Sequence, residues 1–252
     1  MFAPMHKFNS GGVEIAYQEA GEGPPILLIH GFASNARVNW WDTSWVKTLT
    51  DAGRRVITFD HRGHGASQKL YDSALYPAAE MAEDARRLLD HLGIAQADVM
   101  GYSMGARVSA FLTIAHPSRV RRAVFAGLAS RMITGVGGAE AIAVALEAPS
   151  RSDVSDVGAR SFRIFAEQTK SDLKALAACI RSSREKITQE ELATIRVPVL
   201  VVAGEKDDVA GDVETLVRAI PGAEGVTLAN RNHMNAVGDR GYKEAVLAFL
   251  AA

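Results

Sequence analysis

Gly101-Tyr102-Ser103-Met104-Gly105 is the most informative stretch of this 252-residue sequence. A serine flanked by glycines at two-residue spacing is typical of a nucleophile elbow, a sharp turn between a strand and a helix. The turn holds the serine in a strained backbone conformation. Side chains two residues before and two residues after it would collide, which is why glycine occupies both positions. The motif therefore indicates Ser103 as a nucleophile.

The residues on either side of the motif supply the context that an elbow requires. Residues 96–100 are expected to form a short buried strand, and residues 106–115 are expected to form a helix that ends at His116-Pro117. An ordinary tight turn is the competing interpretation of five such residues. The succession of strand, turn and helix favours the elbow.

The amino-acid composition and net charge of the chain exclude some classes of function. The formal net charge is −1, and 48% of the residues are hydrophobic and 23% are charged, as in an ordinary soluble globular protein. The densest basic cluster, Arg119, Arg121 and Arg122, follows a predicted helix end and is expected to be a solvated loop. A basic field for nucleic-acid binding is lacking, so we expect no nucleic-acid partner.

The cysteine count and the first ten residues indicate the compartment. Cys179 is the single cysteine, which excludes an intrachain disulfide, and its alanine-rich surroundings predict a buried, inert thiol. Residues 1–10 contain no apolar run of the length of a signal peptide or membrane span. The expectation is a cytoplasmic protein without a membrane partner.

Apolar runs and helical spacings alternate along most of the chain. Residues 26–29 are apolar at every position, as in a strand covered on both faces. The predicted strands are 13–19, 25–30, 55–60, 96–100, 123–127, 199–204 and 225–228, and the predicted helices are 41–51, 78–92, 106–115 and 242–250. This alternation predicts an α/β fold, a mostly parallel sheet with helices on both faces.

The alternation fails between about residues 129 and 196. This stretch shows only helical patterns, at 139–147, 154–168, 173–184 and 189–195. We interpret 129–196 as a small helical cap over the carboxyl ends of the strands, where an open α/β sheet places its site. Residues 1–128 and 197–252 then form the two parts of the core.

A serine hydroxyl needs a base and a group that orients the base. Asp207 follows the predicted strand 199–204, and His233 follows the strand that ends at residue 228. Both positions are loops at strand carboxyl ends, and the order Ser, Asp, His is the order expected with an elbow. We therefore predict a catalytic set of Ser103, Asp207 and His233, with Asp208 as the alternative acid.

The segment His30-Gly31-Phe32 follows the most apolar predicted strand. A glycine there allows a sharp turn, after which the N–H of Phe32 would face the same space as the N–H of Met104. Two such donors would form an oxyanion hole, although the segment has a second interpretation as a simple strand end.

Residues 60–67, Asp-His-Arg-Gly-His-Gly-Ala-Ser, contain two histidines at a spacing of three. Without a third ligand nearby in the sequence, this spacing is a weak metal signal. We assign the segment to loop architecture and predict no metal site.

Together these segments resemble the α/β-hydrolase fold superfamily. The matching pieces stand in the family order along nearly the whole chain: His30-Gly31-Phe32, residues 60–67, the elbow, Gly204-Glu205-Lys206-Asp207 and Asn232-His233-Met234. The resemblance implies an eight-stranded, mostly parallel sheet with a helical cap, and a triad of Ser103, Asp207 and His233. It also implies an oxyanion hole from the Phe32 and Met104 amides, with no metal and no organic cofactor.

The sequence departs from the family pattern at two places. Ala106 stands where members often have glycine, and Val209-Ala210-Gly211 stands where members often have proline after the acid. The second departure loosens the placement of the acid loop. The nucleophile is unaffected, and a serine at the elbow implies acyl transfer, where an aspartate would point to dehalogenases or epoxide hydrolases.

The leading hypothesis is a carboxylesterase for small or medium acyl esters. The candidate pocket residues are uncharged and offer no anchor for a charged head group: Phe32, Trp40, Trp41, Tyr102, Met104, Ile133 and Phe165. Lactone hydrolysis resembling the enol-lactonases is the nearest alternative, followed by C–C bond and thioester hydrolysis.

A non-catalytic ligand-binding protein on the same scaffold is an alternative of another class. Retention of all three triad residues argues against it. The alanine-rich stretch Leu173–Ile180 would also suit a homodimer contact, although a cap helix on its own domain explains it as well. The sequence leaves the choice between monomer and homodimer open.

Overall fold

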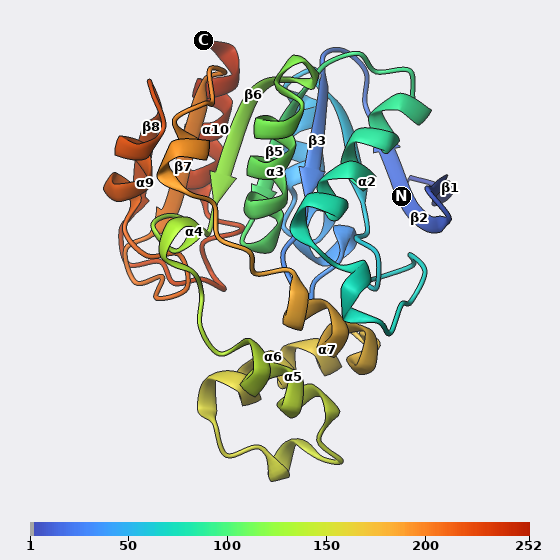
Figure 1. The fold of residues 1–252 in the computed structure, drawn as a ribbon. Helices are drawn as coiled ribbons and strands as arrows, with labels where there is room; N and C mark the ends of the chain where they lie inside the picture. The colour runs from blue at the N-terminus through green and yellow to red at the C-terminus, as the bar shows by residue number, and fades with distance from the viewer. Residues whose placement is uncertain (1–2) are drawn as a thin grey trace.

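The computed structural model describes residues 3–252, and within this range eight strands form a single sheet (Figure 1). The strand order is β1-β2-β4-β3-β5-β6-β7-β8. The strands are β1 (His6–Ser10), β2 (Val13–Ala20), β3 (Pro25–Ile29), β4 (Arg55–Phe59), β5 (Ala97–Tyr102), β6 (Val120–Ala126), β7 (Val199–Gly204) and β8 (Glu224–Leu228).

The sheet is mostly parallel, as predicted. Strands β3 to β8 pair in parallel, while β2 pairs antiparallel with both β1 and β4 at one edge. Parallel strands direct their carboxyl ends to the same side of the sheet, so the loops after β3, β5, β7 and β8 meet there. This geometry is what brings distant motifs of the sequence together.

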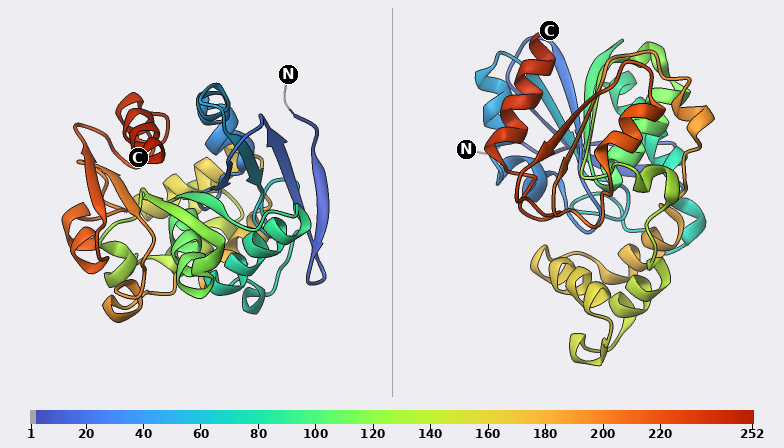
Figure 2. Two further views of the ribbon diagram at one scale, coloured as in Figure 1. Left: turned by 90° about the horizontal axis from the view of Figure 1, so that it is seen from above. Right: turned by 90° about the vertical axis from the view of Figure 1, so that its left-hand side faces the viewer.

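Helices cover both faces of the sheet (Figure 2). On β3, Ile26 and Leu28 belong to a core formed with α1 (Trp45–Asp51) and α10 (Arg240–Ala251). Leu27 and Ile29 point to the opposite core, formed with α2 (Ala78–His91), α3 (Met104–Ala115) and α9 (Val213–Ala219). Since successive residues of a strand face opposite sides, an apolar run is required for burial on both faces.

The stretch between β6 and β7 is helical. It contains α4 (Arg131–Thr134), α5 (Ala139–Glu147), α6 (Val157–Gln168), α7 (Leu173–Ser182) and α8 (Gln189–Leu192). Figure 1 shows α5, α6 and α7 lying beyond the end of the sheet to which the β3 and β6 arrows point. Thr169 ties this layer to the core, because its hydroxyl donates a 2.9 Å hydrogen bond to the carbonyl of Ala33.

Several elements differ from the sequence prediction. The edge strand β1 and helices α4 and α9 were not expected, and a π-helical turn, η1 (Arg37–Trp41), precedes α1. Three short 3₁₀ turns complete the chain: η2 (Ser73–Leu75), η3 (Pro117–Arg119) and η4 (Arg151–Asp153).

Candidate active site

Ser103 occupies the sharp turn between β5 and α3. Its backbone has φ 56° and ψ −115°, a conformation that non-glycine residues rarely adopt. A Cβ on Gly101 would overlap the carbonyl of Gly105, and a Cβ on Gly105 would overlap the carbonyl of Ile29. The predicted elbow is therefore present, with the predicted reason for its two glycines.

Two side chains from other loops complete the arrangement around Ser103. His233 Nε2 lies 3.1 Å from Ser103 Oγ, and His233 Nδ1 lies 3.0 and 2.9 Å from the two carboxylate oxygens of Asp207. Ser103 follows β5, Asp207 follows β7 and His233 follows β8. The structure thus brings the three predicted residues into one hydrogen-bonded chain.

The acid position is occupied by Asp207, and Asp208 is exposed. The Asp207 side chain is buried, and its Oδ1 also accepts hydrogen bonds from the N–H groups of Val209 (3.0 Å) and Ala210 (2.9 Å). These bonds hold the carboxylate in place without the proline expected from the family pattern. Tyr102 supports the histidine loop by donating a 2.6 Å hydrogen bond from its hydroxyl to the carbonyl of His233.

The two predicted oxyanion donors are available for a ligand. Among residues 3–252, the backbone N–H groups of Phe32 and Met104 donate no hydrogen bond to the protein. Gly31 allows the close approach of the two loops, because a Cβ there would lie 3.4 Å from the Ser103 Cβ and 3.2 Å from the Tyr102 carbonyl. Two free donors beside a nucleophile suit a tetrahedral oxyanion.

A cavity of about 650 Å³ opens beside Ser103 and His233. Phe32, Tyr102 and Phe165 line it, as predicted. Phe162, Ile164 and Val237 add to its apolar wall. Most of its lining comes from the loops after β3, β5 and β8 and from α6.

Three predicted pocket residues lie elsewhere. Trp40 is fully buried in the core beside α1 and α10, and Trp41 packs against the same core. Ile133 packs in the opposite core, on α4. Neither of the two cavities beside Ser103 includes these residues in its lining, because their side chains are used to join helices to the sheet.

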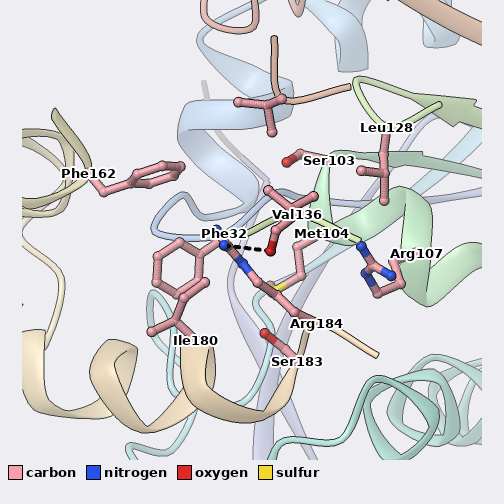
Figure 3. A pocket seen from close by; sticks show the side chains of 11 residues that line it. Phe32, Ser103, Met104, Arg107, Leu128, Val136, Phe162, Ile180, Ser183 and Arg184 are labelled. Atoms are coloured by element: carbon pink, nitrogen blue, oxygen red, sulfur yellow. Dashed lines mark hydrogen bonds between the residues drawn. The ribbon is translucent and has the colours of Figure 1, made fainter. Parts of the chain in front are cut away.

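A second, smaller cavity of about 30 Å³ is also lined by Ser103 (Figure 3). It shares Phe32, Ser103, Phe162 and Val209 with the larger cavity. Its lining also includes two cationic side chains that the sequence analysis did not identify, Arg107 from α3 and Arg184 just beyond α7. Arg107 lies four residues after Ser103, in the helix that follows the elbow. Because residues four apart share a helix face, this spacing indicates that Arg107 lies near the nucleophile.

The segment 60–67 builds a loop, as predicted. The Asp60 carboxylate accepts hydrogen bonds from the N–H groups of Ala36 and Ala66, each at 2.7 Å. Arg62 forms a buried ion pair with Asp84 of α2 at 2.7 Å. In the described part of the chain, no group of three or more His, Cys, Asp or Glu side chains is arranged so that it could hold a metal ion.

Three buried histidines pack together behind this loop. The ring centroids of His30 and His61 are 4.6 Å apart, and those of His30 and His64 are 5.3 Å apart. Burial lowers the pKa of His30 to about 4 and that of His64 to about 3, and it lowers the pKa of His61 well below its usual value. The cluster is therefore neutral at physiological pH.

The fold and the Ser–His–Asp arrangement define a protein of the α/β-hydrolase fold. A family model for this fold matches residues 24–146, which include the elbow. The chain belongs to the α/β-hydrolase superfamily.

Individual proteins similar to this chain have several activities. A non-heme chloroperoxidase of Kitasatospora aureofaciens is 38% identical over 94 residues, which cover 37% of this chain and 32% of that protein. A 2-hydroxymuconate semialdehyde hydrolase of Pseudomonas putida is 37% identical over 118 residues, which cover 47% of this chain and 41% of that protein. The matched part thus spans less than half the length of these curated relatives.

Among solved structures, a hydrolase from Pseudomonas aeruginosa PA01 superposes with a TM-score of 0.81 at 28% identity, covering 98% of both chains. None of the helices formed by residues 3–252 has the length and apolar character needed to cross a membrane.

Proposed function

We propose that this protein is a serine hydrolase that cleaves carboxylic esters through an acyl-enzyme intermediate. The observation that carries the proposal is the position of His233, with Nε2 at 3.1 Å from Ser103 Oγ and Nδ1 at 2.9 Å from Asp207. A base in contact with both a hydroxyl and a buried carboxylate is what nucleophilic activation of serine requires.

The chemistry follows from this geometry. His233 Nε2 accepts the proton of Ser103 Oγ while Oγ attacks the carbonyl carbon of the ester. The N–H groups of Phe32 and Met104 receive the oxyanion, and the imidazolium then protonates the departing alcohol. A water activated by the same histidine attacks the acyl-enzyme, and the acid product leaves with Ser103 regenerated. Asp207 keeps the Nδ1 proton directed toward itself and so presents Nε2 to the serine.

The larger cavity supports an ester with a small or medium acyl or alcohol part. Its volume of about 650 Å³ lies within the range of small-molecule sites, and its wall is largely apolar. The proposed reaction uses no metal or organic cofactor, and the protein would act as a monomer or homodimer on a small-molecule substrate. The similar hydrolases support hydrolysis in general.

Covalent labelling by a fluorophosphonate tests the proposal without knowledge of the substrate. We expect the intact mass of the wild type to increase by one adduct and the mass of Ser103→Ala to stay unchanged. Absence of an adduct on the wild type would contradict the proposal. An adduct on both proteins would show that another residue is the nucleophile.

A substrate panel then separates esters from the alternatives. Aryl acetates and butyrates, aliphatic lactones, thioesters and a vinylogous 1,5-diketone for C–C hydrolysis would be compared by kcat/KM. The highest kcat/KM is expected for an ester. A labelled enzyme that turns over lactones or diketones and no ester would replace the proposed substrate class.

A further inference from the structure

The small cavity beside Ser103 contains an unusual concentration of positive charge. Arg107 is almost fully buried and Arg184 is half-buried, and both line the cavity (Figure 3). Among residues 3–252, neither guanidinium has a carboxylate partner within 4.0 Å. The buried arginines elsewhere in the molecule are paired, as Arg62 is with Asp84.

Backbone carbonyls hold both side chains in place. Arg107 Nη1 donates a hydrogen bond to the carbonyl of Glu185, and Arg184 Nη1 donates to the carbonyls of Val136 (3.1 Å) and Gly137. The Nε and Nη2 atoms of both arginines have no acceptor among the described residues. Each guanidinium is therefore anchored at one corner and keeps N–H donors for a ligand.

The positive charge of the two guanidinium groups is only partly offset by nearby groups. Burial, together with the charge of Arg184, lowers the pKa of Arg107 to about 10, and burial lowers the pKa of Arg184 to about 10. The Glu185 carboxylate acts in the opposite direction on Arg107, but its Oε2 accepts a hydrogen bond from the N–H of Ala78. Two like charges next to one cavity favour an anion between them.

We propose that the small cavity binds a carboxylate carried by the substrate, so that the preferred substrates are half-esters of dicarboxylic acids or similarly acidic esters. This inference rests on the proposed ester hydrolysis and defines its substrate class. It replaces the sequence-based expectation that no residue of the pocket anchors a charged group, because Arg107 and Arg184 line the cavity.

The size and position of the cavity determine where the carboxylate would lie. A volume of about 30 Å³ is sufficient for one small polar group, since a single water needs roughly half as much. Ser103 lines both cavities. With the scissile carbonyl at Ser103, a short arm of the acyl part would reach the arginines, and the rest of the molecule would occupy the larger cavity.

Paired substrates test this inference. The monoethyl esters of succinate, glutarate and adipate would be compared with the corresponding uncharged monoamide ethyl esters, which have the same shape. We expect kcat/KM for the best half-ester to exceed that of its amide by about 10- to 100-fold, as for a charge-assisted hydrogen-bonded ion pair. A ratio near one would contradict the inference.

Substitutions assign the selectivity to the cavity. Arg184→Gln should lower the ratio of acid to amide kcat/KM by about 10-fold or more, mainly through a higher KM for the half-ester, and Arg184→Lys should restore part of it. Arg181→Gln is the matched control, because Arg181 lies three residues earlier, in the last turn of α7, but pairs with Glu140 and Glu147 at the surface and should leave the ratio unchanged. Equal ratios in Arg184→Gln and Arg181→Gln would overturn the assignment.

A binding measurement separates this inference from the proposed function. Glutarate should bind Ser103→Ala in a calorimetric titration and should not bind Ser103→Ala/Arg184→Gln. Binding that is the same for both proteins would refute the carboxylate site. Fluorophosphonate labelling of the wild type reports on the hydrolase proposal alone, so a labelled enzyme with no glutarate binding would retain the first proposal and lose the second.

Discussion

Asp207 and Asp208 are adjacent residues with different environments. Asp207 is buried against His233 and two backbone N–H groups, whereas Asp208 is exposed. The backbone of one loop turns the two carboxylates apart, and this decides which of them orients the base.

We predict that Asp207→Asn lowers kcat for an ester by about 10⁴-fold, because the amide favours the wrong tautomer of His233. Asp208→Asn should change kcat by less than about twofold. Steady-state kinetics on the best ester of the panel measures both. A greater loss in Asp208→Asn would show that the acid is assigned to the wrong residue.

Gly105 is constrained by its neighbours in space. We predict that Gly105→Ala lowers the free energy of unfolding by about 1–3 kcal/mol, because its Cβ would overlap the carbonyl of Ile29 and force the elbow to move. It should also reduce fluorophosphonate labelling. Gly137→Ala is the control, since its Cβ would have no neighbour within 4 Å, and it should change stability by less than about 0.5 kcal/mol. Urea unfolding compares the two, and equal effects would contradict the steric argument.

At the scale of elements, the sheet was predictable wherever burial requires a continuous apolar run. Strand β3 is an example, because its residues face two cores. The edge strand β1 was not predictable, since only Phe8 and Ser10 of its five residues are buried. Its extended conformation depends on antiparallel pairing with β2. Helix α9 is only seven residues long, but its cap was present in the sequence: Asp212 accepts a hydrogen bond from the N–H of Thr215.

The pair of Arg62 and Asp84 connects the loop after β4 to α2. Asp84 Oδ1 and Oδ2 accept from Arg62 Nη2 and Nε at 2.8 and 2.7 Å, and both side chains are buried. We predict that Asp84→Asn lowers the free energy of unfolding by about 3–5 kcal/mol, because it leaves the buried Arg62 guanidinium with only the partly exposed Glu80 carboxylate, at 3.3 Å, as a counter-charge. Glu80→Gln, on the same helix but about 41% exposed, should lower it by less than about 1 kcal/mol. Urea unfolding measures both variants, and losses of similar size for Asp84→Asn and Glu80→Gln would contradict the prediction.

At the scale of the whole molecule, the neutral cluster of His30, His61 and His64 makes stability depend on pH. Folding lowers the pKa of all three, to about 4 for His30 and about 3 for His64. The unfolded chain therefore binds more protons below its pKa of about 6.5, so the contribution is complete above that pH and is lost as the pH falls toward 4.

We predict that the free energy of unfolding decreases below pH 6.5 with a slope on the order of 1.4 kcal/mol per pH unit for each histidine. His64→Gln, which removes one titrating ring, should reduce that slope by about a third. Urea unfolding at several values between pH 7.5 and 4.5 measures the slopes. Identical slopes for the wild type and His64→Gln would show that other groups govern acid unfolding.

The sequence alone predicts most of the sheet, the elbow, Ser103 and His233, because each belongs to a local pattern of strand, turn and loop, and it limits the acid to Asp207 or Asp208. The choice between the two acids and the residues that surround the site depend on how the chain packs in three dimensions. Arg107 and Arg184 are 77 positions apart and line one cavity, whereas Trp40 and Trp41, near the site in sequence, belong to the core. The physical reason is that a cavity wall is assembled from several elements packed in space, and no periodicity within one segment records which side chains meet there.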